Sequence, residues 1–353
     1  MLKLTSNSTI HQTINQLEWL IQTDLGHRGI HQLPGENLCT VTQGNLYRAI
    51  KFLAENPGCQ VGIVTGFYIP TSNPPAPEND GPPGALFMAR GLNQLGYPVV
   101  MITDLYCKTP LQQGIELFKN QIDNSELIEF PFKDDEVNLF ENDFFRNYPD
   151  LKCLISIERV GPCYTMTSFL NSLPKPNKSA IAQFEKYGPG DLAGERLNMR
   201  GIPVTQYTAP IHRLFERELH HDKKIFTIGI GDGGNEIGMG SIPWLIIANN
   251  ILNGLGGKIA CRIETDATIV AGVSNWAGYA LIAGLFLYLN RRDDFLKLFS
   301  NKSETQLIET YYRTGSAVDG KLGCPAMSVD GIQWETHLEI LDFIKMICKN
   351  SSR

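Results

Sequence analysis

The segment that decides the fold is Ile225-Phe226-Thr227-Ile228, followed at residues 229–240 by Gly-Ile-Gly-Asp-Gly-Gly-Asn-Glu-Ile-Gly-Met-Gly. The apolar run is typical of a buried strand, and the six glycines after it indicate a loop whose backbone approaches other groups closely. An ordinary turn needs only about one or two glycines. Asp232, Asn235 and Glu236 lie in this loop, and two carboxylates with an amide predict a site for a hard cation or a polar substrate.

The same loop contains the spacing Gly229-x-Gly231-x-x-Gly234, which matches a dinucleotide-binding pattern after a strand. That pattern expects an acidic residue about 20 positions further on to bind the ribose. Residues 250–258 contain no acid, and Asp232 would repel a pyrophosphate held by the loop. We therefore expect no nucleotide cofactor.

The rest of the chain alternates between short apolar runs and amphipathic stretches. Residues 61–64 and 98–103 are typical of buried strands, with a helix at 85–95 between them. This order predicts an α/β fold with three layers, α/β/α, around a mainly parallel, Rossmann-like sheet. We expect a single domain over residues 1–353, with its core at about 24–345 and a polar, irregular excursion at about 171–198.

Further elements follow from the same periodicities. We expect strands at residues 151–157, 225–230, 259–263 and 268–273, helices at 11–24, 44–55, 211–219, 276–289 and 335–348, and an irregular acidic stretch at 133–150. The uncharged run at 267–290 reads as a buried strand and a core helix of about 14 residues, which is too short to span a bilayer. We therefore expect no membrane partner.

The overall composition narrows the functional classes. The chain has 31 basic and 37 acidic residues, a net charge of −6, and no basic stripe, which argues against a nucleic-acid partner. Its eight cysteines form no C-x-x-C pair, and the N-terminus has no apolar signal core. These features predict a cytoplasmic protein, and further copies of the chain stay open as partners.

Polar residues follow several of the expected strands. Thr65-Gly66 follows one strand and Asp80 lies in its loop, Glu158-Arg159 follows another, and Ser274-Asn275 follows a third. Ligands of an open parallel sheet bind beyond the carboxyl ends of its strands, so we expect these residues to form one site. The alternatives are structural: a turn at Asp80, an ion pair between Glu158 and Arg159, and a helix cap at Ser274.

With these residues in view, the chain resembles the C-terminal domain of D-glutamate cyclase, a family long catalogued as a domain of unknown function. The resemblance covers roughly residues 24 to 345. The matching segments are Val64-Thr65-Gly66-Phe67, Asp80-Gly81-Pro82-Pro83-Gly84, Ile157-Glu158-Arg159-Val160-Gly161, Asn198-Met199-Arg200-Gly201, residues 229–240, Val270-Ala271-Gly272-Val273-Ser274-Asn275-Trp276, and Val329-Asp330-Gly331 with Thr336-His337.

The resemblance implies cyclisation of D-glutamate to 5-oxo-D-proline with loss of water, and therefore a small acidic molecule as the partner. Single-domain relatives have instead been proposed to be manganese-dependent phosphatases, and a binding protein that senses an amino acid is a third hypothesis. Fuller family members carry a further N-terminal domain, and we expect none in this chain. The chain also has Pro162-Cys163-Tyr164 in place of a compact family segment and His212 in place of an expected aspartate.

These considerations assign hypothetical roles to the site. Mn²⁺ or Mg²⁺ is expected on Asp232, Asn235 and Glu236, and Glu158, Asp80 and Asp232 are the expected catalytic groups. Either Arg28 or Arg159 would bind the substrate's α-carboxylate. The remaining expected substrate contacts are Thr65, Gly66, Ser274 and Asn275, whose backbone amides would receive a phosphate if the protein is a phosphatase.

Overall fold

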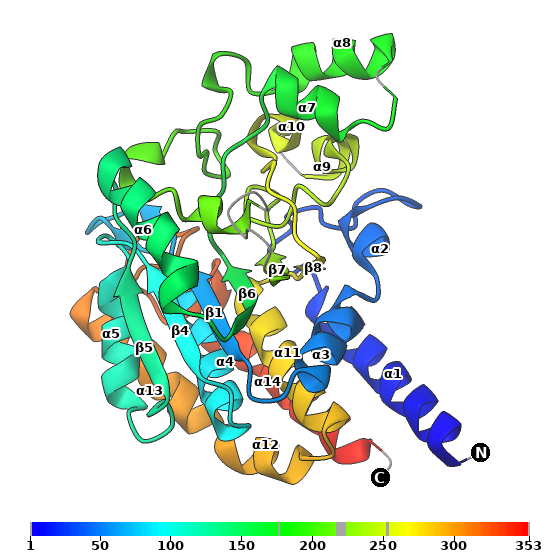
Figure 1. Cartoon of the computed structure of the whole chain (residues 1–353), viewed down its shortest axis with the longest axis vertical. Helices are drawn as coiled ribbons and strands as arrows, with labels where there is room; N and C mark the ends of the chain where they lie inside the picture. Colours follow the sequence, from blue (N-terminus) through cyan, green and yellow to red (C-terminus); the bar gives the residue numbers. More distant parts are fainter. Residues whose placement is uncertain (1, 176, 217–223, 252–253, 352–353) are drawn as a thin grey trace.

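A parallel sheet at the centre of the molecule organises the fold (Figure 1). The computed structural model describes residues 2–175, 177–216, 224–251 and 254–351. Six strands lie in the order β5-β4-β1-β6-β7-β8, and every neighbouring pair is parallel. Their bounds are β1 Gln60–Thr65, β4 Val99–Thr103, β5 Ser125–Glu129, β6 Leu151–Ile157, β7 Phe226–Gly231 and β8 Ala267–Val270. The expected mainly parallel, Rossmann-like sheet is confirmed.

Helices cover both faces of this sheet and give the three layers (Figure 1). Apolar residues alternate between the faces, so Val99 and Met101 join one core whereas Val100 and Ile102 join the other. The first core includes α1 (Leu2–Ile21), α3 (Asn45–Glu55), α4 (Pro82–Gln94), α5 (Lys108–Leu117), α11 (Ser274–Tyr288), α12 (Arg292–Leu298), α13 (Asn301–Thr314) and α14 (Trp334–Asn350). The second includes α2 (Leu38–Thr42), α6 (Asp134–Asn147), α7 (Met166–Ser172), α8 (Lys178–Tyr187), α9 (Trp244–Asn250) and α10 (Gly256–Ile259).

Helix α11 is the centre of the first core. Fourteen of its fifteen residues are buried, which explains why this stretch of sequence carries no charge. The uncharged run at 267–290 is therefore strand β8 followed by helix α11, as expected. Among the described helices, none is both long and apolar enough to cross a membrane.

The side of the sheet on which the chain adds new strands changes between β1 and β6. From β1 the chain adds β4 and β5 on one side, and it then returns to add β6, β7 and β8 on the other. Two connections that leave a sheet in opposite directions open a crevice at the carboxyl ends of the strands between them. The residues that follow β1 and β6 therefore begin the site.

Two stretches expected to be irregular contain helices. Residues 134–147 form α6, whose first turn carries three acids and whose Val137 and Phe144 are buried. Acids stabilise a helix N-terminus, so the acidic composition there was a helix signal rather than a loop signal. The excursion at 171–198 contains α8, which is capped by the side chain of Asn177. Its buried Phe184 stacks on Phe169 of α7.

Two other predictions named the wrong kind of secondary structure. Residues 259–263, expected to be a strand, contain the end of α10 and one isolated bridge between Cys261 and Cys163. The expected helix at 211–219 is a 3-10 helix at Ile211–Phe215, and 217–219 lie outside the described residues.

Two short hairpins lie outside the central sheet. One, near the C-terminus, consists of β9 (Ser328–Val329) and β10 (Ile332–Gln333). Another hairpin, β2 (Tyr68–Ile69) with β3 (Ala76–Pro77), follows β1.

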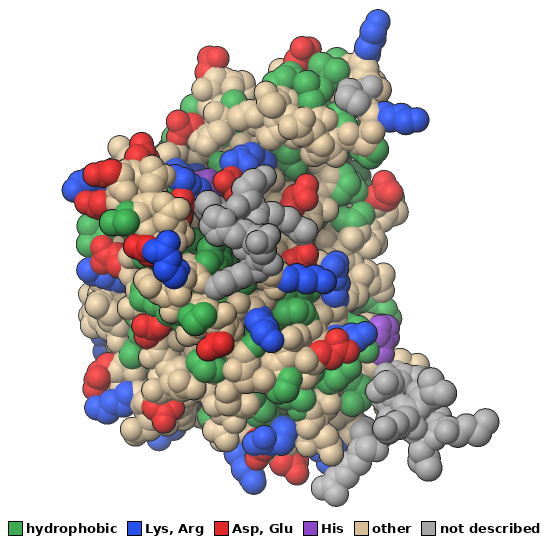
Figure 2. All heavy atoms as spheres, in the orientation of Figure 1, with side chains coloured by type: hydrophobic (Ala, Val, Ile, Leu, Met, Phe, Trp, Pro, Cys, Tyr) green, Lys and Arg blue, Asp and Glu red, His purple; other side chains and the backbone are tan. Residues whose placement is uncertain are grey.

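The visible surface carries both signs of charge. Figure 2 shows acidic and basic side chains interspersed over this face, without a broad patch of one sign. The concentrated charge of the molecule lies instead in the buried crevice at the end of the sheet.

Candidate active site

The N-termini of α4 and α11 meet at the crevice and cap each other. The Asp80 carboxylate, just before α4, accepts backbone N–H bonds from Ser274 and Asn275 at 2.8 Å each. In return, the Asn275 amide oxygen accepts N–H bonds from Gly81 at 3.0 Å and Gly84 at 2.7 Å. Unpaired N–H groups at helix starts need such acceptors. Asp80 therefore shapes more than a local turn, because it joins two helices.

Ser274 has a different role from the helix cap considered for it. It lies inside α11, and its hydroxyl donates a 2.6 Å hydrogen bond to the Glu158 carboxylate at the end of β6. Glu158 has φ +45°, and Asp330, in the turn between β9 and β10, has φ +54°. A left-handed backbone at a residue other than glycine costs about 1–3 kcal/mol and is concentrated at functional sites. Here both strained residues carry carboxyl groups into the crevice.

The glycine-rich loop after β7 is folded around its own glutamate. Glu236 accepts backbone N–H bonds from Gly233 at 2.7 Å and Gly234 at 2.8 Å. A Cβ atom on Gly231 would lie 2.7 Å from the Glu236 carboxylate, which is closer than real contacts allow. The glycines therefore serve the close packing of the loop around Glu236. This loop places Asp232, which is fully buried, at the centre of the crevice.

Arg28, from the loop after α1, supplies positive charge to this centre. Its guanidinium lies 3.1 Å from an oxygen of Asp232 and 2.8 Å from an oxygen of Asp330. Burial by itself would lower the pKa of Arg28, but the charges of Asp232 and Asp330 raise it well above its ordinary value. Arg28 is thus held between two carboxylates before any substrate arrives.

The crevice buries more carboxyl groups than Arg28 can neutralise. Burial raises the pKa of Asp80 to about 7, and the charge of Asp330 adds to that shift. Burial is also the main cause of raised pKa values at four further carboxyl groups, those of Glu78, Glu158, Asp232 and Glu236. A buried charge without a partner is costly, so such a cluster either retains protons or gathers cations.

The expected ligand atoms for a metal ion lie close together. Oxygens of Glu158, Asp232 and Glu236 are within 4.8 Å of one another, and so are oxygens of Asp80, Asp232 and Asp330. Among the described residues, neither Asp232 oxygen accepts a hydrogen bond, although one forms the ion pair with Arg28.

The expected amide ligand, Asn235, has its Nδ2 bonded to the Leu197 carbonyl at 2.8 Å. Its buried Oδ1 accepts no hydrogen bond from a described residue. Within the part of the chain that the structure describes, Asp232 and Asn235 thus bury oxygen atoms that accept no hydrogen bond, and metal binding itself stays a prediction.

Arg159 is placed in a structural network. Its guanidinium donates 2.5 Å and 2.9 Å hydrogen bonds to the Asp104 carboxylate and the Ala209 carbonyl, and a third, of 2.8 Å, to the Gly66 carbonyl. It ties the ends of β1, β4 and β6 together and does not line the pocket described below. The buried Thr65 hydroxyl has no partner among the described residues. Substrate contacts by Arg159, Thr65 and Gly66 stay predictions.

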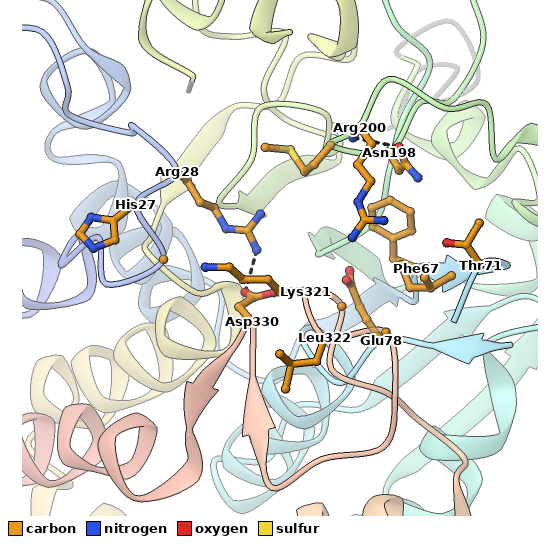
Figure 3. A pocket seen from close by; sticks show the side chains of 15 residues that line it. His27, Arg28, Phe67, Thr71, Glu78, Asn198, Arg200, Lys321, Leu322 and Asp330 are labelled. Atoms are coloured by element: carbon orange, nitrogen blue, oxygen red, sulfur yellow. Dashed lines mark hydrogen bonds and ion pairs between the residues drawn. The ribbon is translucent and has the colours of Figure 1, made fainter. Parts of the chain in front are cut away.

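A pocket of about 410 Å³ opens above the buried carboxylates (Figure 3). Arg28, Glu78 and Asp330 belong to its wall and connect it to the crevice. Figure 3 shows these side chains pointing into the opening from the α1 loop, the β3 region and the β9–β10 turn. The pocket gives a small molecule access to the end of the sheet.

The sequence interpretation missed two acidic members of the site. Glu78 directly follows β3 and is buried, and Asp330 lies in the short turn between β9 and β10. The segment Val329-Asp330-Gly331 was part of the family resemblance, so Asp330 had a signal that was not used. The sequence around Glu78 contains no such signal, because it does not indicate that the segment after the β2–β3 hairpin lies at the crevice.

Comparison with known proteins agrees with the resemblance found in the sequence. The family model described as "D-glutamate cyclase-like, C-terminal" matches residues 17–345. This chain belongs to that family. It is also similar to the human protein "D-glutamate cyclase, mitochondrial", with 28% identity over 360 residues that cover 94% of this chain and 51% of the human protein.

The chain thus spans about half the length of the curated relative it matches. The activity of that longer protein is not carried over by similarity alone, because function depends on the individual site. The relative's name places it in mitochondria, and the location of this chain stays a prediction. The family to which this chain belongs is thus described by the name of a cyclase.

The raised pKa of Glu78 predicts how stability depends on pH. In chelator-treated protein, the folded state holds this proton at pH values where the unfolded chain has lost it, so rising pH destabilises the fold above the unfolded pKa. Glu78→Gln removes the penalty and should stabilise the protein at pH 8.5 by about 1–3 kcal/mol, with little change at pH 4. Urea unfolding measures both, and equal effects at the two pH values would contradict the assignment.

The network of Arg159 predicts a structural phenotype. Arg159→Met leaves the buried Asp104 carboxylate without its ion pair and should lower the free energy of unfolding by about 3–5 kcal/mol. The matched control is Arg146→Met, which breaks an exposed pair with Asp143 and should cost less than about 1 kcal/mol. Urea unfolding compares the two. Normal stability with lost substrate binding in Arg159→Met would instead support the role predicted from sequence.

Proposed function

We propose that this chain forms 5-oxo-D-proline from D-glutamate with loss of water, assisted by a divalent cation. The observation that supports this most is the group of buried carboxyls with raised pKa values beneath a small open pocket, in a chain of the D-glutamate cyclase-like family. Groups with strongly shifted pKa values in a pocket are typical of proton-transfer catalysis.

The reaction requires protons to move between the amine and an oxygen of the substrate. The amine nitrogen attacks the γ-carboxyl carbon, the C–N bond forms, and one C–O bond breaks. Two protons of the substrate ammonium leave with that oxygen as water, and the third remains on the lactam nitrogen. Glu158 is the proposed carrier of these protons, because burial raises its pKa and Ser274 orients its carboxylate.

Asp80 and Asp232 have separate proposed roles. Three backbone N–H groups hold the Asp80 carboxyl group rigidly in place, and its charge, when it is ionised, contributes to the raised pKa of Glu158. Asp232 lies between Arg28 and Glu236 and is the proposed centre of the cation site. The residues Ser274 and Asn275 hold this arrangement rather than presenting free amides to a ligand.

A hard cation fits the residues around Asp232. The available donors are carboxylate and amide oxygens, the type that Mg²⁺ and Mn²⁺ prefer. Asp232 and Asn235 both bury oxygens that accept no hydrogen bond from a described residue. We propose that Asp232, Asn235 and Glu236 hold the ion, which when bound would supply a Lewis acid for the γ-carboxylate.

A metal-dependent phosphatase is the second candidate. Asp232 belongs to both groups of three carboxylates, so two cations could share it as a bridging ligand. Pairs of cations are common in enzymes that hydrolyse phosphate esters. The third hypothesis, a binding protein without catalysis, is tested by the experiment described next.

The test is incubation of the purified chain with D-glutamate and Mg²⁺, followed by proton NMR. Chromatography of quenched samples serves for Mn²⁺. We expect 5-oxoproline from the metal-loaded protein and a loss of about 10²–10⁴-fold in rate for Glu158→Gln. The matched control is Asp123→Asn at an exposed carboxylate, which should leave the rate unchanged.

Three results would contradict the proposal. Equal product with chelated protein would remove the cation from it, and an unchanged rate in Glu158→Gln would remove the proton carrier. Absence of product from folded, metal-loaded protein would overturn the cyclase activity. Phosphate release from phosphate esters would then favour the phosphatase, and thermal stabilisation by D-glutamate without turnover would favour the binding protein.

A further inference from the structure

The mouth of the pocket carries charge opposite to that of its inner wall. Glu78 and Asp330 are buried in the wall, whereas Arg200 and Lys321 line the same pocket as exposed residues. Figure 3 shows Arg200 and Lys321 on different sides of the opening, with the Arg200 guanidinium directed toward Glu78. A ligand that enters therefore meets two cations before it reaches the acids.

Arg200 and Lys321 are available to bind a ligand, whereas Arg28 is already paired with carboxylates of the protein. Arg28 is within 3.1 Å of both Asp232 and Asp330 and is neutralised by them. None of the ion pairs among the described residues involves Arg200 or Lys321. The sequence had suggested Arg28 or Arg159 for the substrate carboxylate, and both are held by carboxylates of the protein.

The backbone that carries Arg200 is fixed by a side chain. The Asn198 amide oxygen accepts N–H bonds from Arg200 at 2.9 Å and from Ile202 at 3.0 Å, and the Gly201 N–H bonds back to the Asn198 carbonyl at 2.8 Å. Gly201 completes the turn at φ +69°, a conformation that glycine adopts without strain. Arg200 is thus presented from a defined turn at the pocket rim.

The loop that carries Lys321 is fixed by the fully buried Asp319. One oxygen of Asp319 accepts the N–H groups of Lys321 at 2.9 Å and Leu322 at 2.8 Å. The other accepts the Ser328 hydroxyl at 2.5 Å and the Gly331 N–H at 2.7 Å. Both Ser328 and Gly331 lie within two residues of Asp330, so one carboxylate couples the lysine loop to the turn that carries an acid of the wall.

We propose that Arg200 and Lys321 select a dicarboxylic substrate by each binding one of its carboxylates. The inference rests on the proposed function and extends it, because it assigns the groups that recognise the substrate. A guanidinium suits a carboxylate through two parallel hydrogen bonds, and an ammonium acts as a compact point charge. An acidic amino acid held in this way keeps its ammonium free to face the buried carboxyl groups beneath the pocket, including Glu158, the proposed carrier of its protons.

The test compares ligand binding by calorimetry, with Mg²⁺ present, in the full chain and in Arg200→Met and Lys321→Met. Glutarate is the main probe, because it has two carboxylates and no amine and cannot cyclise. Each substitution should weaken glutarate binding about ten- to hundredfold, the effect of losing one charge-assisted hydrogen bond. Lys302→Met, at an exposed lysine of α13 away from the pocket, is the matched control and should bind normally.

A ligand with a single carboxylate separates recognition from general charge attraction. D-Glutamine can use only one of the two cations, so one substitution should weaken its binding and the other should not. Equal weakening of D-glutamine by both substitutions would overturn the assignment of one carboxylate to each residue. Unchanged glutarate binding in both variants, or none in the unaltered chain, would overturn the inference as a whole.

The same variants distinguish this inference from the proposed function. Selective glutarate binding without conversion of D-glutamate would retain the dicarboxylate site and reject the cyclase activity. Conversion of D-glutamate with an unchanged KM in both variants would retain the cyclase activity and reject the role of Arg200 and Lys321. Both side chains are exposed, so the variants should fold normally, as an unchanged unfolding midpoint would verify.

Discussion

The constraint on which the rest of the structure depends is the burial of six carboxyl groups at one end of the sheet, around a single arginine that forms ion pairs with them among the described residues. Such a concentration of acid is unstable unless each group is protonated, paired or hydrogen-bonded. The fold supplies several such partners. The start of α11 donates N–H groups to Asp80, the glycine loop donates N–H groups to Glu236, and Arg28 joins Asp232 to Asp330.

This arrangement explains why the site and the fold cannot be separated. Asp80 and Asn275 hold the starts of α4 and α11 together, and α11 is the most deeply buried helix of the first core. The position of the Asp80 carboxyl group is therefore fixed by the packing of the core, whereas Asp232 and Asp330 are carried by a loop and a turn at the end of the sheet. The cations of the pocket rim, Arg200 and Lys321, are by contrast exposed above these buried acids. A rigid acidic centre beneath a cationic mouth suits a substrate that carries both signs of charge.

Much of the fold could be predicted from the sequence, because strands and the loops after them depend on local patterns of apolar residues and glycines. The apolar run and glycines around residue 230 predicted a strand and the loop after it, and oxygens of Glu158 and Asp232, which follow neighbouring strands, lie within 4.8 Å of each other in the structure. The partners of those residues could not be predicted. Whether Arg159 faces a substrate or Asp104 depends on contacts between β4 and β6 that are distant in sequence. Acidic α6 was missed because its apolar face was outweighed by its charge.

The central claim is that the folded, metal-free protein retains protons on part of this cluster at neutral pH. Infrared spectroscopy of chelator-treated protein at pH 7 tests it most directly, because a protonated carboxylic acid has a C=O stretching band separate from that of a carboxylate. The account predicts such a band, with the shift in D₂O expected of an exchangeable proton, and its reduction in Glu78→Gln and Glu158→Gln. A spectrum in which every carboxyl group is ionised at pH 7 would contradict the account.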